Sequence, residues 1–249
     1  MHPLGSSTLS RLNQGSTASC KPHLIKLFVR LNGRSVEGCA LKVLAVASRK
    51  GGSSKTTICV HLAGLADEEG GCVILDADPQ ASASVWYELR QDERPFVVPV
   101  GVDNLRKVLA TIKGDGFAYS MVDCPPHNEA SISEAMRAAD LIAVPIRPSL
   151  FDLRAAEATF SMARALKRPA VAVLTGVPPP MTGGEASIVR EARAYLEAID
   201  AEVCTATIGQ RAAFSHALLS GSNAVEYEPG GKAAREAAAL WRELKDRMQ

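Results

Sequence analysis

The octapeptide K-G-G-S-S-K-T-T at residues 50–57 is the feature that most constrains what this chain can fold into. It follows an apolar run at residues 43–47 and precedes a helical pattern that begins at Ile58. A strand, a glycine-rich turn and a helix in this order place backbone N–H groups and the positive end of the helix around a phosphate group. The sequence therefore predicts a phosphate-binding loop between a buried strand and a helix.

The loop departs from the general pattern G-x-x-x-x-G-K-[ST] at both glycines. Arg49 and Ser54 occupy the two glycine positions, and an additional lysine, Lys50, lies five residues before Lys55. Two lysines on one phosphate loop suggest that one serves the bound nucleotide and that the other serves something else.

Composition excludes several classes of protein. At 249 residues the chain can bury one sizeable core, and its net charge of +1 gives no global basic field, so nucleic-acid binding would need a local patch. The six cysteines include no C-x-x-C pair, which is typical of reduced thiols in a cytosol. The five histidines form no ligand-spaced set, and no apolar run approaches the roughly 20 residues of a membrane helix.

Residues 1–40 are expected to form an N-terminal extension, disordered or loosely attached, to a domain at residues 41–249. The first 19 residues are rich in Ser, Gly and Thr and show no helical or strand periodicity. Their acid-poor composition also resembles an organellar transit peptide, an alternative that we consider less favoured. Residues 23–31 could add an edge strand or a short helix.

Short apolar runs alternate with helical patterns after residue 41. Four runs end at Asp76, Asp123, Pro145 and Thr175, and each is apolar on both faces. Such runs, each followed by a helix, are typical of a buried parallel sheet. The predicted fold is a doubly wound α/β domain, with a mostly parallel sheet and helices on both faces. Ligands of such sheets lie at the carboxyl ends of the strands, where the polar residues of this chain converge.

The residues at that edge predict a Mg²⁺–nucleotide site. Lys55 is expected to reach the outer phosphates, and the hydroxyl of Thr56 is expected to ligate Mg²⁺. Asp123 is the carboxylate expected to hold the ion directly or through water, because Mg²⁺ needs few protein oxygens. In the segment D-A-D-P-Q at residues 76–80, Asp78 is the expected water-positioning group and Asp76 a further supporting ligand of the metal.

Three segments together resemble the deviant Walker ATPases of the ParA/MinD superfamily, and in particular the small ParA (ParF-like) partition proteins. They are K-G-G-S-S-K-T-T at residues 50–57, D-A-D-P-Q at 76–80 and V-D-C-P-P at 122–126. Further segments also fit that subgroup, at residues 82–86, 145–152, 210–214 and 226–236. The resemblance covers roughly residue 41 to the C-terminus.

This resemblance implies an ATPase whose ATP and Mg²⁺ are sandwiched between the two subunits of a homodimer. Lys50 would reach the partner's nucleotide, and a cation supplied in trans can accelerate phosphoryl transfer roughly 10³- to 10⁵-fold. Lys50, Lys55 and Asp78 would then be the catalytic residues. The expected nucleotide contacts are Lys50, Gly51, Gly52, Ser53, Ser54, Lys55, Thr56 and Thr57, with Thr175 and Pro178 near the base.

The resemblance also implies partners. Members of the family bind DNA nonspecifically as the ATP dimer, and a small adaptor protein that marks the cargo stimulates them. The expectation is a cytoplasmic, nucleoid-associated protein that segregates or positions plasmid or chromosomal DNA, without stable membrane insertion. Arg211, Arg190 and Arg193 lie in the half of the chain where the family places its DNA contacts.

Ser54 is the main departure from the family, which has glycine immediately before the loop lysine. A residue forced into an unfavourable backbone conformation costs about 1–3 kcal/mol. We expect slower hydrolysis without loss of binding, although the Ser54 hydroxyl could donate to a phosphate. Thr175 and Gly176 stand where relatives carry Asn and a second polar residue, so adenine preference rests on the resemblance alone.

Three alternatives stay open at this point. The first is an ATP-binding dimerisation switch that does not hydrolyse because of Ser54. The second is a MinD-like membrane-associated regulator, which would need an amphipathic C-terminal anchor. The apolar stripe of the last helix fits a docking face on the sheet better, because its polar side is not predominantly basic. This stripe comprises Ala237, Leu240, Trp241, Leu244 and Met248. The third is a metabolic ATP-dependent ligase, for which no second substrate pocket is visible.

Overall fold

The structure, a computed structural model, describes residues 40–179 and 184–249. The predicted extension at residues 1–39, with its candidate strand or helix at 23–31, lies outside the described residues.

The described residues form an eight-stranded sheet in which every pairing is parallel. The strand order is β3-β2-β4-β1-β5-β6-β7, and β8 also pairs with β6. This order places β1, which leads into the phosphate loop, in the middle of the sheet between β4 and β5. The strands are β1 (Lys42–Val46), β2 (Cys72–Asp76), β3 (Phe96–Pro99), β4 (Tyr119–Asp123), β5 (Leu141–Ile146), β6 (Ala170–Val177), β7 (Glu202–Val203) and β8 (Ile208–Gly209).

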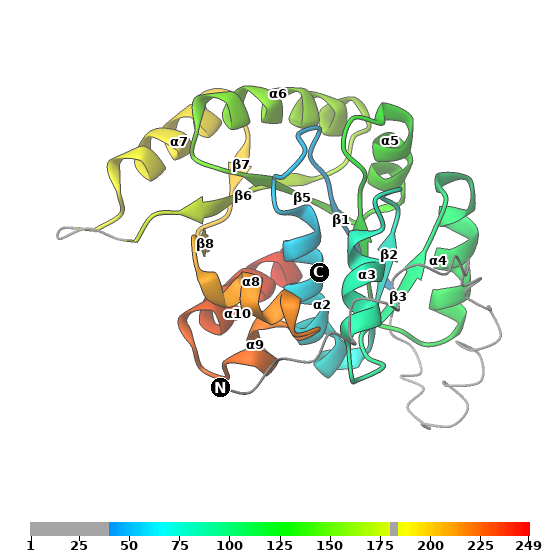
Figure 1. Cartoon of the computed structure of the whole chain (residues 1–249). Coiled ribbons are helices and arrows are strands. Elements are labelled where there is room, and N and C mark those ends of the chain that lie inside the picture. The colour runs from blue at the N-terminus through cyan, green and yellow to red at the C-terminus, as the bar shows by residue number, and fades with distance from the viewer. Residues whose placement is uncertain (1–39, 180–183) are drawn as a thin grey trace, which may run out of the picture.

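Helices cover both faces of the sheet (Figure 1), which confirms the predicted doubly wound α/β fold. One face carries α4 (Leu105–Gly114), α5 (Glu129–Ala138), α6 (Leu150–Ala165) and α7 (Ser187–Ala198), with the 3₁₀ turn η1 (Val102–Asn104) before α4. The other carries α2 (Lys55–Gly70), α3 (Ser82–Leu89), α8 (Ala212–Leu219), α9 (Ala224–Tyr227) and α10 (Lys232–Arg247).

The strands are apolar on both faces because each face packs into its own hydrophobic core. In β1, Val43 and Ala45 belong to the core under α4–α7, whereas Leu44 and Val46 belong to the core under α2 and α10. Side chains alternate between the faces of a strand, so a strand covered on both sides reads as a continuous apolar run.

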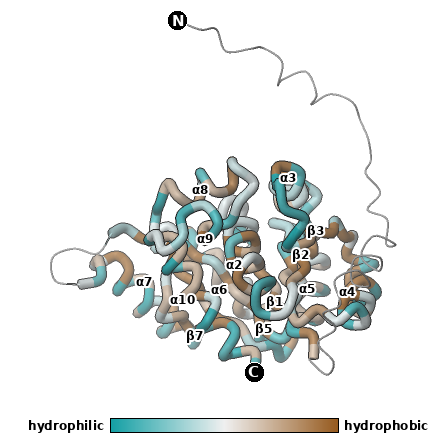
Figure 2. Tube along the Cα trace, turned by 90° about the horizontal axis from the view of Figure 1, so that it is seen from below, coloured by the Kyte–Doolittle hydropathy of each residue, from teal (hydrophilic) through white to brown (hydrophobic). Residues whose placement is uncertain are grey.

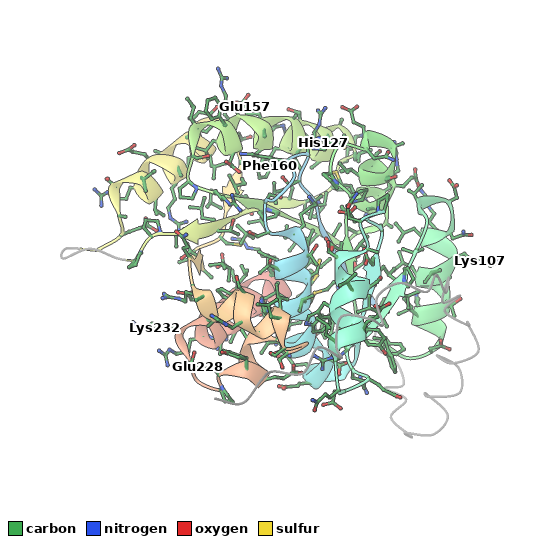
Figure 3. The ribbon with its side chains drawn as sticks, in the orientation of Figure 1. Lys107, His127, Glu157, Phe160, Glu228 and Lys232 are labelled. Carbon is green, nitrogen blue, oxygen red and sulfur yellow. The ribbon has the colours of Figure 1, made fainter. Side chains whose placement is uncertain are left out.

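The outer helices are amphipathic. Figure 3 shows Phe160 pointing from α6 toward the sheet and Glu157 pointing away from it. Hydrophobic and hydrophilic stretches likewise alternate along α4 and α7 in Figure 2, as expected for helices with one face in the core.

α2 and α10 differ in how much of their surface is buried. α2 buries consecutive residues such as Ile58, Cys59 and Val60, so it lies within the molecule rather than on its surface. α10 buries one apolar stripe against the same core: Ala237, Leu240, Trp241, Leu244 and Met248. The predicted docking role of this stripe is confirmed. Within the described part of the chain, no helix is long and apolar enough to cross a bilayer.

A buried histidine joins α2 to the first residue of α9. His61 Nδ1 accepts a hydrogen bond from the backbone N–H of Ala224 at 3.0 Å, and its ring lies 4.9 Å from that of Phe214. Burial lowers the pKa of His61 from 6.5 to about 4. The folded protein therefore holds His61 neutral at neutral pH.

We expect this histidine to make folding stability pH-dependent. The unfolded chain protonates His61 below about pH 6.5, but the folded chain does so only near pH 4. The free energy of unfolding should therefore fall by about 3 kcal/mol as the pH drops between these values because of this one group. Urea unfolding of His61→Asn, which keeps an acceptor for Ala224, should lack this component. Asn in place of the exposed His216 is the control, and an unchanged pH slope in His61→Asn would contradict the account.

Candidate phosphate-binding site

The polar ends of three neighbouring strands meet at one edge of the sheet. Asp123 at the end of β4 is in register with Val46 of β1 on one side and with Asp76 of β2 on the other. The chain leaves Val46 for the phosphate loop, and this loop lies at the edge where α5 and α6 begin (Figure 1). The predicted convergence of the loop with Asp76 and Asp123 is confirmed.

The loop turns into α2 through a left-handed residue. Ser54 has φ 74° and ψ 23°, and Gly52 has φ +70°. The first α-helical bond of α2 runs from the N–H of Ile58 to the carbonyl of Ser54 at 3.0 Å. The first N–H groups of a helix have no partner within the helix, so the start of α2 offers donors to an anion. Ser54 thus adopts the strained conformation that its replacement of a family glycine predicts.

Two side chains of the loop donate to one carbonyl inside it. Ser53 Oγ and Lys55 Nζ lie 3.1 and 3.3 Å from the carbonyl oxygen of Lys50. Lys55 is buried, and no acidic partner pairs with its ammonium group among the described residues. A buried cation whose only acceptor is a neutral carbonyl is well placed to bind phosphate oxygens.

A cavity of about 450 Å³ opens over the loop. Its lining comprises Gly51, Gly52, Ser53, Ser54, Lys55, Thr56, Thr57, Asp78, Gln80, Ser82, Pro126 and Arg147. The structure thus brings the predicted loop residues together with Asp78. Gln80, Ser82, Pro126 and Arg147 are additions that the sequence did not assign, and Lys50 lies outside this lining.

Thr56 and Asp123 form a pair suited to a hard cation. Thr56 Oγ1 donates to Asp123 Oδ2 at 2.6 Å, whereas Asp123 Oδ1 is buried without a hydrogen-bond partner among the described residues. The pKa of Asp123 is raised to about 7, chiefly by burial and with a smaller contribution from the nearby charge of Asp76, while the hydrogen bond from Thr56 acts in the opposite direction. A buried carboxylate with a spare oxygen beside a hydroxyl fits the oxygen ligands that Mg²⁺ takes.

The other two acidic residues of the edge have local roles. Asp76 Oδ2 accepts hydrogen bonds from the N–H and the hydroxyl of Ser84, at 2.8 and 2.7 Å, and therefore fixes the start of α3. Asp78 is half-buried in the cavity, and its Oδ1 accepts from the N–H of Gln80 at 2.9 Å. The metal role of Asp76 and the water-positioning role of Asp78 stay predictions.

Lys50 is held by its own chain. Its Nζ lies 2.5 Å from Oδ2 of Asp152, a buried residue in the first turn of α6. Ser149, the N-cap of α6, donates its hydroxyl to the same carboxylate oxygen. Sequence reasoning named Asp152 only within the segment at 145–152 that fits the family and did not pair it with Lys50, because 102 residues separate the two. Any contact of Lys50 with a second subunit requires this ion pair to open.

The two residues predicted to contact the base lie on or just after β6, which is separated from β1 by β5. Thr175 belongs to β6 and is buried, and its hydroxyl oxygen has no partner among the described residues. Pro178 follows β6 and is half-buried. Neither residue lines the cavity over the phosphate loop, so their contact with a base stays a prediction.

The three predicted DNA-contacting arginines are engaged within the chain. Arg211 pairs with Glu236, with its Nε 2.8 Å from Oε1. Arg193 pairs with Glu185 at 3.1 Å and also donates to two backbone carbonyls. Arg190 donates to the carbonyl of Glu185. Their role in DNA binding stays a prediction.

Comparison with known proteins identifies the family of this site. Residues 44–224 match the CobQ/CobB/MinD/ParA nucleotide binding domain. The chain belongs to this family. The match extends from β1 to the start of α9, and thus includes the loop, the edge with Asp76 and Asp123, and the cavity.

The relatives of this CobQ/CobB/MinD/ParA domain include positioning and partitioning proteins. The chain is 28% identical over 196 residues to maintenance of carboxysome distribution protein A of Halothiobacillus neapolitanus, covering 78% of this chain and 91% of the relative. The protein of that name from Gloeobacter kilaueensis is 30% identical, with 83% and 94% covered. Chromosome partitioning protein ParA of Caulobacter vibrioides is 30% identical over 45% of this chain and 58% of its own length.

Solved structures of the family share the fold at low identity. An ATP complex of a Cyanothece McdA variant has a TM-score of 0.67 at 17% identity, with 84% of this chain and 98% of that chain covered. MinD of Pyrococcus horikoshii complexed with Mg-ADP has a TM-score of 0.66 at 16% identity, with 82% and 96% covered.

The left-handed conformation of Ser54 predicts a stabilising substitution. Ser54→Gly should raise the free energy of unfolding by about 1 kcal/mol, because glycine adopts positive φ without the steric cost borne by other residues. Ser54→Ala keeps that cost and serves as the control. Denaturant unfolding would contradict the account if both variants were equally stable.

Proposed function

We propose that the chain is an ATP-dependent, dimerising ATPase of the ParA type, which binds DNA nonspecifically and segregates or positions a DNA cargo with an adaptor protein. The observation that carries this proposal is the placement of the two loop lysines. Lys55 lines the nucleotide cavity, whereas Lys50 lies outside it and is partly exposed beside Asp152. Under this proposal, Lys55 serves the chain's own nucleotide and Lys50 serves that of a second subunit.

A lysine outside its own cavity fits a role in a second subunit. The Lys50 side chain is 38% exposed and its partner Asp152 only 8%, so the lysine is the more accessible member of the pair. An ATP dimer would draw Lys50 to the partner's phosphates and leave Asp152 with its Ser149 hydrogen bond. Removing an ion-pair partner from a buried carboxylate is costly, so this exchange would tie dimerisation to the nucleotide charge.

The metal of the proposed ATPase would be Mg²⁺, held by Thr56 and Asp123. Bound there, the ion would neutralise charge that develops on the phosphates. Lys55 and the N–H groups at the start of α2 would bind the phosphates of ATP. Asp78, which faces the same cavity, would orient the attacking water.

The different roles proposed for Lys50 and Lys55 can be tested with a variant of Lys50. Lys50→Gln should keep ATP affinity but lower ATP turnover by about 10³-fold, because it removes a cation from the transition state. Lys107→Gln, on the exposed face of α4 and labelled in Figure 3, is the matched control. Turnover and fluorescent-ATP binding are measured on the same samples. If Lys50→Gln loses ATP binding in proportion to turnover, Lys50 serves its own subunit and the proposal is wrong.

A basic groove beside α10 supports the DNA-binding part of the proposal. Lys232, Arg235 and Arg242 are exposed residues of α10, at helical spacings of three and seven. The groove, of about 370 Å³, is lined by Thr205, Ala206, Thr207, Arg211, Lys232, Arg235, Glu236 and Ala239. Cations and hydroxyls on one face suit the sugar–phosphate backbone, which carries no sequence information. Lys232 lies beside Glu228, on the opposite side of the molecule from Lys107 (Figure 3).

Lys232→Gln and Arg235→Gln should weaken DNA binding about equally for all sequences. Each neutralised contact should also reduce the slope of log affinity against log salt by about 1, because fewer counterions are released. Binding of labelled duplexes is measured with ATP at several salt concentrations, again with Lys107→Gln as the control. Unchanged affinity and slope in both variants would remove this groove from the DNA site.

A second candidate function is an ATP-binding dimerisation switch with slow or absent hydrolysis, and the left-handed Ser54 favours it. Under this alternative the protein dimerises on ATP and DNA stimulates little turnover. Ser54→Gly should then raise turnover sharply, and an unchanged rate would show that Ser54 is not the defect. The MinD-like alternative loses its main support, because the apolar stripe of α10 is buried in the core.

In cells, the proposal places the protein in the cytoplasm on the nucleoid. The proposed partners are a second copy of the chain, nonspecific DNA and a small cargo-binding adaptor. The names of the relatives, for carboxysome distribution and for chromosome partitioning, support a positioning role.

A further inference from the structure

One cation of the cavity has no role in the site as derived above. Arg147 follows β5 directly, and β5 pairs with β1, which carries the phosphate loop. Arg147 therefore emerges at the same edge of the sheet as the loop. Its side chain lines the same cavity as residues 51–57 and Asp78.

The stem of Arg147 lies beside the neighbouring strand. Gly176, in β6, has φ +62°, and a Cβ added to it would lie 3.8 Å from Cγ of Arg147. The stem thus passes close to Gly176 on its way into the cavity.

The other exposed cations around the loop are already paired. Arg49 forms an ion pair with Glu129, and Lys50 forms one with Asp152. No side-chain hydrogen bond or ion pair of Arg147 is found among the described residues, and its nearest acidic neighbour in the cavity lining is Asp78. Lys55 and Arg147 are consequently the two cations of the cavity lining that a polyanion would meet.

We propose that Arg147 binds the phosphate chain of the nucleotide within its own subunit, as a second cation opposite Lys55. A guanidinium group presents a planar fork of donors that can bind two phosphate oxygens at once, which a lysine cannot do. Its charge also offsets that of Asp78, which would otherwise oppose an anion in the cavity. This inference rests on nucleotide binding by the family, and not on the proposed DNA or adaptor interactions.

The lining of the cavity favours phosphate over base as the target of Arg147. Backbone, hydroxyl and charged groups predominate there, and the lining residues include no aromatic ring on which a base could stack. The candidates for base contact, Thr175 and Pro178, lie outside the lining.

The test compares nucleotides that differ only in phosphate number. In the full chain, Arg147→Gln should lower the affinity for ATP and ADP about 10- to 100-fold, the value of a charge-assisted hydrogen bond or bidentate pair. The loss for AMP should be smaller, and weak binding of adenosine should not change. Arg147→Lys should recover part of the ATP affinity, because charge returns without the fork. Affinities are measured by calorimetry or by competition against a fluorescent nucleotide.

Arg106→Gln, on the exposed side of α4, is the matched control for loss of an arginine. Thermal unfolding of each variant without nucleotide checks that the fold is intact, as expected for an exposed side chain. Equal losses for adenosine and ATP would assign Arg147 to the base or ribose and overturn the proposal. Unchanged ATP affinity in Arg147→Gln would overturn it as well.

This experiment is separable from the proposed function. It uses no DNA, adaptor or turnover, so a protein that binds ATP through Arg147 but never binds DNA would refute the partition role alone. Conversely, DNA-stimulated turnover with an unaffected Arg147→Gln would refute only the present inference.

Discussion

The turn between β1 and α2 is the constraint on which the rest of the structure depends. β1 lies between β4 and β5, and α2 is buried against the sheet. The loop that joins β1 to α2 must therefore lie at the edge formed by the carboxyl ends of these strands. This edge is where Asp123 ends β4 and Arg147 follows β5. The left-handed Ser54 then turns the N–H groups at the start of α2 toward the cavity.

Much of this arrangement could be predicted from the sequence because it is encoded locally. Runs that are apolar on both faces predicted β1, β2, β4, β5 and β6, and the parallel order put their polar ends on one edge. β7 and β8 are two residues long and leave no periodic pattern, while β3 lies at the edge of the sheet. The contacts that the sequence did not predict, Lys50 with Asp152 and Arg147 with the cavity, join residues about a hundred positions apart. Hydrophobic periodicity and short motifs carry no information about contacts between residues so distant in the sequence.

The three cations around the phosphate loop differ in the groups that they contact. Among the described residues, Lys55 is buried with a neutral carbonyl as its hydrogen-bond acceptor, Arg147 lines the cavity without an ion pair, and Lys50 is paired with Asp152. In the proposed mechanism, Lys55 and Arg147 bind the nucleotide of their own subunit, and Lys50 binds the nucleotide of the other subunit. If Arg147 adds affinity for phosphate, it would also offset some of the cost of Ser54 in a position where the family has glycine.

The central claim is that Lys50 completes the site of a second subunit, and mixing two inactive variants tests it most directly. Lys50→Gln keeps Asp78, and Asp78→Asn keeps Lys50, so each variant alone should hydrolyse ATP poorly. In a mixed dimer, one site would combine Asp78 of one subunit with Lys50 of the other. The account predicts that ATP turnover reappears when the two proteins are mixed. Turnover that stays at the level of the separate variants, under conditions where a mixed dimer is shown to form, would contradict it.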